Sequence, residues 1–178
     1  TDAPTMTHGP PTPLEDRPAR TVPAGSVAHT GLIPPPEEMG DWKSGDVIDG
    51  KYEVRERLGH GGMGVVYRVH HRHWRIDLAV KIPTRALVDH PQARQRFLRE
   101  AETWVGLGVH PNIVQCWYVR ELSGIPRLFL DYVSGSNLKQ AMRAGDPAPG
   151  QWDRILDLMV QACDGLGHAH AQGMVHRD

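Results

Sequence analysis

The glycine-rich stretch LGHGGMGVVY, residues 58–67, decides how this sequence is interpreted. Gly59, Gly61 and Gly64 have the spacing G-x-G-x-x-G, and Val66 extends it to G-x-G-x-x-G-x-V. Glycines let backbone N–H groups approach phosphate oxygens where a Cβ would clash. The strand-forming run VVY follows these glycines, whereas a helix follows them in a dinucleotide-binding Rossmann unit. The pattern therefore disfavours a Rossmann unit and leaves a phosphate-binding loop or a glycine-rich hairpin without a ligand.

Around the glycines, hydrophobic periodicity predicts an α+β fold whose first strands form an antiparallel meander. Strands are expected at residues 52–59, 65–70, 78–82, 113–119 and 127–133. Helices are expected at 91–108, 135–142 and 153–173. Helical spacing places Phe97, Ala101, Trp104 and Val105 on one face of the first of these helices, and Ile155, Met159, Cys163 and Leu166 on one face of the last.

Composition excludes several classes of function. The formal net charge of −1 gives no electrostatic reason to expect a nucleic-acid or membrane-surface partner. No apolar run reaches the roughly 18 residues of a membrane span. Cys116 and Cys163 lie far apart in apolar surroundings, which predicts reduced core thiols of a cytoplasmic protein. HHRHW, residues 70–74, is expected to be an exposed turn rather than a metal site, because no carboxylate or cysteine lies close to it.

The first 40 residues differ from the rest of the chain. They contain nine of the fifteen prolines and few large apolar residues. Such a segment buries too little surface to offset the entropy of ordering it, so residues 1–40 are expected to form a disordered tail.

Lys81 is the most unusual residue of the predicted strands, since it lies in the apolar run LAVKI, residues 78–82. A lysine on a buried strand needs an anionic partner or a route to solvent. Nucleotide phosphates or a helix carboxylate would supply that partner. Glu100 and Glu102 lie on opposite edges of the apolar arc of the helix at 91–108, and helical geometry leaves the choice between them open.

Several further motifs follow in a fixed order: LAVKI, FLREAE, HPNIV, LFLDYVSGSNL and GMVHRD. Together with LGHGGMGVVYRV they resemble the protein kinases, most of all the eukaryotic-like Ser/Thr kinases of bacteria. The resemblance covers about residues 50–178 and leaves residues 1–40 outside. It implies a kinase N-lobe at 41–133, with a five-stranded antiparallel sheet and an αC helix. The first helices of an incomplete helical C-lobe would follow at 134–178.

The resemblance also implies an ATP site. Gly59, Gly61 and Gly64 would cover the phosphates, and Lys81 would hold them and pair with Glu100. The adenine would be packed by Leu58, Val66 and Ala79, with Leu130 at the gatekeeper position and Asp131 to Val133 as the hinge. Asp178 would orient the substrate hydroxyl as catalytic base.

The family's Mg²⁺ ligands, an asparagine and the aspartate of Asp-Phe-Gly, follow the catalytic aspartate, so no metal ligand is assigned within these residues. ATP is the expected cofactor, protein Ser/Thr hydroxyls are the expected substrates, and the 178 residues alone are expected to be inactive. The alternative is a nucleotide-binding pseudokinase or a partner-binding module. For such a module, the apolar stripe of the last helix, if exposed, would be the contact surface.

Overall fold

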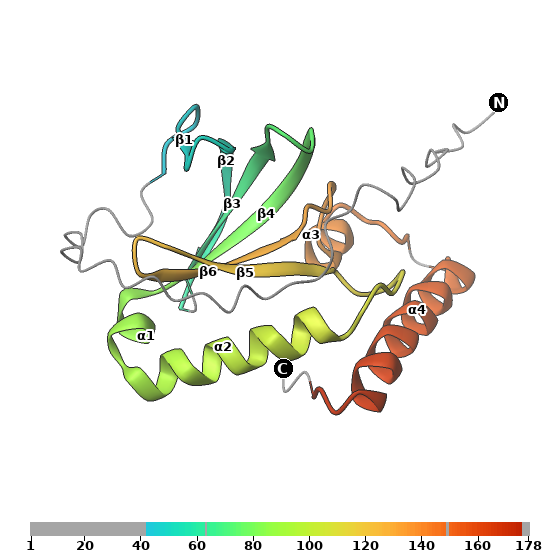
Figure 1. Ribbon diagram of the computed structural model, residues 1–178. Coiled ribbons are helices and arrows are strands. Elements are labelled where there is room, and N and C mark those ends of the chain that lie inside the picture. Colours follow the sequence, from blue (N-terminus) through green and yellow to red (C-terminus); the bar gives the residue numbers. More distant parts are fainter. Residues whose placement is uncertain (1–41, 63, 149, 176–178) are drawn as a thin grey trace.

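The computed structural model describes residues 42–62, 64–148 and 150–175 and shows an antiparallel sheet flanked by helices (Figure 1). The strands are β1 (Val47–Ile48), β2 (Tyr52–Gly61), β3 (Gly64–His71), β4 (Ile76–Pro83), β5 (Cys116–Leu122) and β6 (Ile125–Asp131). The helices are α1 (Arg85–Asp89), α2 (Pro91–Gly106), α3 (Leu138–Arg143) and α4 (Trp152–Ala171). The strand order is β1-β2-β3-β4-β6-β5. The α+β fold and all five expected strands are confirmed, and the two-residue β1 is an addition.

The strand expected at 113–119 begins three residues later, at Cys116. The backbone before it has other partners: Ile113 forms an isolated bridge with His110, and the carbonyl of Gln115 accepts the N–H of Asp131 at 3.0 Å. Residues 113–115 have β-propensity but do not extend β5, because their backbone groups already have these other partners.

The helix ends follow their sequence signals. Pro91 occupies the first turn of α2, and Gly108, with φ of +81°, follows its C-terminus. Asn137 caps α3 in a reciprocal pair with Gln140. Gly173, with φ of +77°, follows α4 in a left-handed conformation.

Two apolar clusters lie on the two faces of the sheet. The larger cluster consists of Tyr52, Val54, Tyr67, Val69, Leu78, Val80, Ile82, Ile125 and Phe129. The smaller consists of Ala79, Ala101, Cys116, Leu128 and Leu130, with Phe97, Trp104 and Val105 of α2 packed against it. The expected inner face of the helix at 91–108 is therefore confirmed, and β4 is buried on both faces. Successive side chains of a strand point to opposite faces, so β4 contributes to both clusters.

Two of the smaller expectations need correction. Cys163 is exposed on α4, so only Cys116 is a core thiol. The HHRHW segment is only partly a turn, because His71 ends β3 and is 5% exposed. Its ring stacks on Trp74 with centroids 4.1 Å apart, and its Nδ1 accepts the Trp74 N–H at 3.1 Å. The expected disordered tail, residues 1–40, lies outside the described residues.

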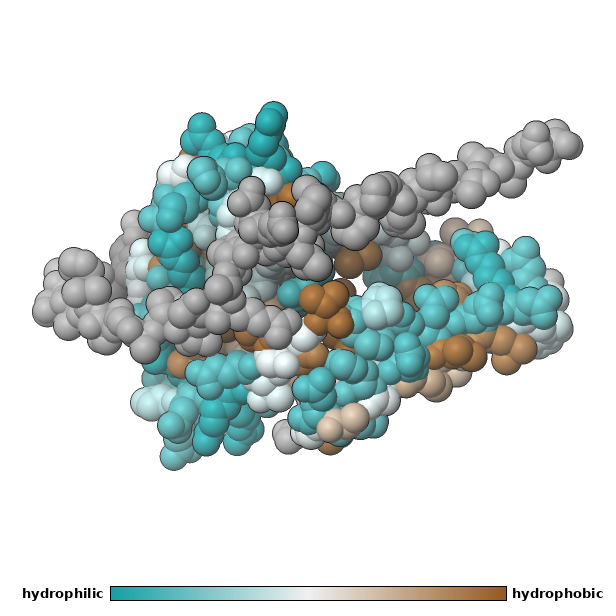
Figure 2. Space-filling view, turned by 45° about the vertical axis from the view of Figure 1, so that its right-hand side comes forward, coloured by the Kyte–Doolittle hydropathy of each residue, from teal (hydrophilic) through white to brown (hydrophobic). Residues whose placement is uncertain are grey.

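The last helix is mostly uncovered. The large apolar side chains of α4 with exposed fractions of 41% or more are Trp152, Leu156, Leu158, Met159, Val160 and Leu166. Figure 2 shows hydrophobic, brown residues gathered on the helical side of the molecule. None of the described helices is long and apolar enough to cross a membrane.

Candidate nucleotide-binding site

One face of the sheet brings several of the predicted site residues together. The strand register pairs Gly59 with Val66, Val66 with Lys81, and Lys81 with Leu128, which forms a row across β2, β3, β4 and β6. Cross-strand partners share a face of the sheet. Ala79 lies two residues before Lys81 on β4 and therefore on the same face. Lys81 is half-buried in this apolar setting.

Apolar side chains form the floor of this face. Ala79 pairs with Leu130 across β4 and β6, and both are buried, with exposed fractions of 8% and 7%. Val66 packs against the same cluster, which also contains Cys116. Burial raises the pKa of the Cys116 thiol to about 12, so this cysteine packs as a neutral apolar group. Apart from Lys81, the floor is thus apolar, as the face of a planar base requires.

The glycines of the β2–β3 hairpin have two different roles. A Cβ added to Gly59 or Gly61 would meet no atom within 4 Å, so open space lies beside this backbone. A Cβ on Gly64 would lie 2.0 Å from the carbonyl oxygen of Ile82, and Gly64 has φ of +136°. Gly64 is therefore required by its close contact with β4, whereas Gly59 and Gly61 leave room for a ligand against the main chain.

The segment after β6 offers open backbone donors, among them the N–H of Val133. The Asp131 carboxylate accepts the indole N–H of Trp117 at 2.6 Å, and the Asp131 N–H donates to Gln115. Within the described part of the chain, no acceptor pairs with the backbone N–H of Val133. Val133 is 67% exposed and Leu58, at a bulge of β2, is 43% exposed, so both lie at the rim of the candidate site.

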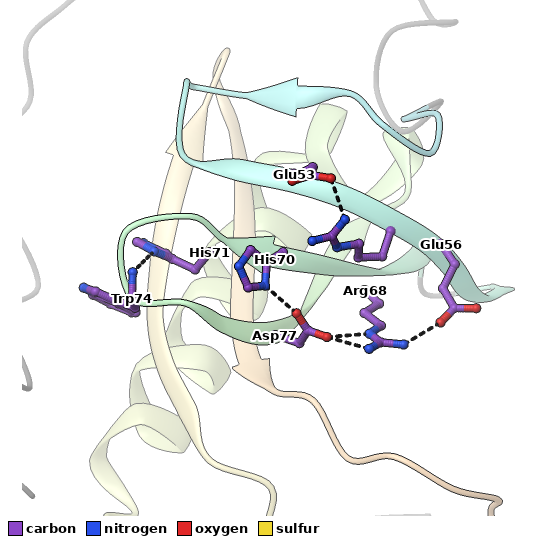
Figure 3. Close-up of polar contacts among 8 residues, drawn as sticks. Glu53, Glu56, Arg68, His70, His71, Trp74 and Asp77 are labelled. Atoms are coloured by element: carbon purple, nitrogen blue, oxygen red, sulfur yellow. Dashed lines mark hydrogen bonds and ion pairs between the residues drawn. The ribbon is translucent and has the colours of Figure 1, made fainter. Parts of the chain in front are cut away.

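A charged network joins strands β2, β3 and β4 (Figure 3). The Arg68 guanidinium donates two hydrogen bonds to Asp77, at 2.8 and 2.6 Å, and one to Glu56 at 3.1 Å. Its carbon lies 4.4 Å from the centroid of the Tyr132 ring, a cation–π contact. Partial burial raises the pKa of Asp77, but hydrogen bonds from His70 and Arg68 outweigh it and hold the pKa below its usual value.

Sequence reasoning missed Arg68. The sequence could have indicated it, because Arg68 lies two residues after Val66 and therefore on the same face of the strand.

Of the three predicted catalytic residues, the structure describes Lys81 and Glu100 but not Asp178. Lys81 and Glu100 take part in none of the ion pairs formed by the residues that the structure describes, and Glu100 and Glu102 are both exposed. The choice between the two carboxylates therefore stays open in the structure. Asp178 lies outside the described residues. No group of three or more His, Cys, Asp and Glu side chains suited to a metal ion occurs in the described part of the chain.

The connection from α2 to β5 docks on α4. The Asn112 side-chain amide donates to the Gln161 carbonyl at 2.9 Å, and His110 lies 3.3 Å from the Asp164 carboxylate. A Cβ on Gly165 would lie 2.8 Å from the Asn112 carbonyl oxygen, so only glycine allows this approach. The docking fixes the sheet relative to the last helix, and nothing in the periodicity of either element predicted it.

The fold and the site define an α+β domain with a glycine-rich hairpin beside an apolar, lysine-bearing sheet face. The protein kinase domain family matches residues 52–178, and the chain belongs to that family. It is 34% identical over 157 residues to the serine/threonine-protein kinase Pkn1 of Myxococcus xanthus, which covers 88% of this chain and 22% of that protein. It is 30% identical over 135 residues to serine/threonine-protein kinase PknB of Mycobacterium leprae. That match covers 74% of this chain and 21% of PknB.

The solved kinase domain of Mycobacterium tuberculosis PknI superposes with a TM-score of 0.65 at 31% identity. That match covers 77% of this chain and 54% of the PknI domain. The chain thus spans about half of a solved kinase domain and about a fifth of the curated relatives it matches. The resemblance to bacterial Ser/Thr kinases, with a kinase N-lobe and the start of a C-lobe, is confirmed.

Proposed function

We propose that this chain is the ATP-binding portion of a serine/threonine protein kinase. The observation that supports this most directly is the single sheet face that holds Val66, Ala79, Lys81 and Leu130 beside the open glycine backbone. A half-buried lysine without an anionic partner among the described residues fits a phosphate better than it fits a structural role.

ATP fits the residues present. The backbone at Gly59 and Gly61 would lie against the phosphates, Lys81 would neutralise them, and the N–H of Val133 would donate to the adenine edge. ATP, with Mg²⁺, supplies the γ-phosphoryl group when bound. Val66 and Ala79 would exclude water from one face of the base, since both project from the apolar floor.

Transfer to a protein Ser or Thr hydroxyl is the proposed activity of a complete domain in the cytoplasm. Asp178 would orient the acceptor hydroxyl, and Glu100 would pair with Lys81 to fix its position. Phosphoryl transfer depends on neutralising the phosphates, and the family's Mg²⁺ ligands come after the catalytic aspartate. These 178 residues alone are therefore proposed to bind nucleotide weakly and to lack kinase activity.

The binding proposal is tested with a fluorescent ATP analogue titrated into the chain. Lys81→Met should weaken binding at least tenfold, which is about 1.4 kcal/mol. Lys43→Met removes an exposed lysine outside the site and is the matched control, expected to bind like the unaltered chain. Absence of saturable binding by the unaltered chain, or equal loss in both variants, would refute the proposal.

Inactivity is tested separately with radiolabelled ATP and a general protein substrate. We expect no incorporation above that of Lys81→Met. Incorporation that depends on Lys81 would contradict the inactivity while supporting the nucleotide site.

The exposed apolar side chains of α4 favour a second candidate, a partner-binding module. Trp152 and Val160 are 68% and 66% exposed, which is unusual for large apolar side chains in one helix. A stoichiometric complex with a folded partner, formed without nucleotide and lost in Val160→Asp, would favour this alternative.

A further inference from the structure

The end of the hairpin strands opposite the glycines carries an open hollow. A cavity of about 470 Å³ lies between the β1–β2 turn and the β3–β4 turn. Its lining residues are Gly50, Lys51, Arg72 and His73. Three of these four side chains are cationic or can become so, and they come from two different turns.

The backbone holds the two turns together. The N–H of Arg72 donates to the carbonyl of Lys51 at 2.9 Å, directly beyond the register pair of Tyr52 and His71. Lys51 and Arg72 therefore face each other as a cross-strand pair of like charge. Such a pair destabilises a sheet unless an anion lies between the charges.

Nearby acidic residues do not neutralise these charges, because they have other partners. Asp49 pairs with Arg120 at 2.6 Å, and Asp77 pairs with Arg68 at 2.6 Å. In the described ranges Lys51, Arg72 and His73 take part in no ion pair. The cavity thus gathers positive charge with no internal counter-ion.

His71 neighbours these groups. Burial is the main cause that lowers its pKa, a backbone hydrogen bond opposes the change, and the electrostatic effects of His73, Lys51 and His70 act in the same direction as burial. His71 ends β3 and lies beside Trp74 (Figure 3).

We propose that Lys51, Arg72 and His73 form a binding site for a phosphate monoester, separate from the candidate nucleotide site. The Arg72 guanidinium and the Lys51 ammonium would both donate hydrogen bonds to the phosphate oxygens, and the His73 ring would add a third donor. The oxygens could belong to a free phosphate or to a phosphorylated side chain. One such side chain is available in the same polypeptide, since Thr30 lies 12 residues before Trp42. Twelve extended residues reach about 40 Å.

The test uses the whole chain carrying Lys81→Met, so that phosphate cannot report on the nucleotide site. Titrations with inorganic phosphate, with the peptide SVAHTGLIP (residues 26–34) phosphorylated at Thr30, and with the unphosphorylated peptide are followed by calorimetry. Adding Lys51→Gln and Arg72→Gln should weaken binding at least tenfold. Lys43→Gln with Arg96→Gln removes the same charge from exposed positions elsewhere and should leave the affinity unchanged.

The outcomes are separable. Tighter binding of the phosphopeptide than of phosphate assigns the site to a phosphorylated segment, and equal affinity assigns it to a small phosphate. No saturable binding of either, or equal loss in the two double variants, overturns the proposal. Thermal melts that match within 3 °C among the variants exclude unfolding as the cause of a loss. The result is independent of nucleotide binding, because Lys81 is absent throughout.

Discussion

Replacing Gly64 by alanine is expected to destabilise the fold far more than replacing Gly61, although both belong to the same motif. The added Cβ at Gly64 would lie 2.0 Å from the Ile82 carbonyl oxygen and 2.9 Å from the Pro83 Cα. Both contacts are with backbone, so β3 or β4 must move. The φ of +136° adds a conformational cost of about 1–3 kcal/mol for any residue with a Cβ.

Together these costs predict a loss of about 2–4 kcal/mol in the free energy of unfolding for Gly64→Ala. In a chain of this size that lowers the melting temperature by roughly 5–15 °C. At Gly61 the added Cβ meets nothing within 4 Å, so Gly61→Ala should change stability by less than about 1 kcal/mol.

Urea unfolding followed by tryptophan fluorescence measures both variants, since Trp42 and Trp74 pack against the larger cluster. Nucleotide titration of the same samples completes the comparison: Gly61→Ala should keep its stability and lose affinity. Equal urea midpoints for the two variants would refute the assignment of Gly64 to the contact with β4.

Three further results are expected. Burial lowers the pKa of His71 below its usual 6.5. The unfolded chain therefore takes up a proton that the folded chain excludes, and the free energy of unfolding should fall as the pH drops below about 6.5. The urea midpoints at pH 7.5 and 5.5 should differ less in His71→Phe than in the unaltered chain, and an equal difference would contradict this. Phe129 has no exposed surface and lies 4.7 Å, centroid to centroid, from Tyr118, so Phe129→Ala should cost about 3–5 kcal/mol in a thermal melt, and a loss below about 1 kcal/mol would show that this cluster is loosely packed. The exposed apolar side chains of α4 should bind an environment-sensitive hydrophobic dye, and Leu156→Ser with Val160→Ser should reduce the fluorescence. A chain without dye binding would show that these side chains are covered in solution.

The sequence by itself determined most of the elements and the side chains that they present. Apolar alternation predicted β2, the strand-forming run after the glycines predicted β3, and the continuous apolar run LAVKI predicted β4. The inner face of α2 followed from helical spacing. The family resemblance added the roles of Lys81, Glu100 and Asp178, which no periodicity could supply.

Only the tertiary structure decided which groups meet. The cross-strand register placed Val66, Lys81 and Leu128 in one row, and pairing between strands cannot be read from either strand alone. The contact of β3 with β4 separated Gly64, a packing requirement, from Gly61, which leaves space for a ligand. The two turns that bring Lys51 beside Arg72 are distant in sequence, so their shared cavity exists only in the folded chain.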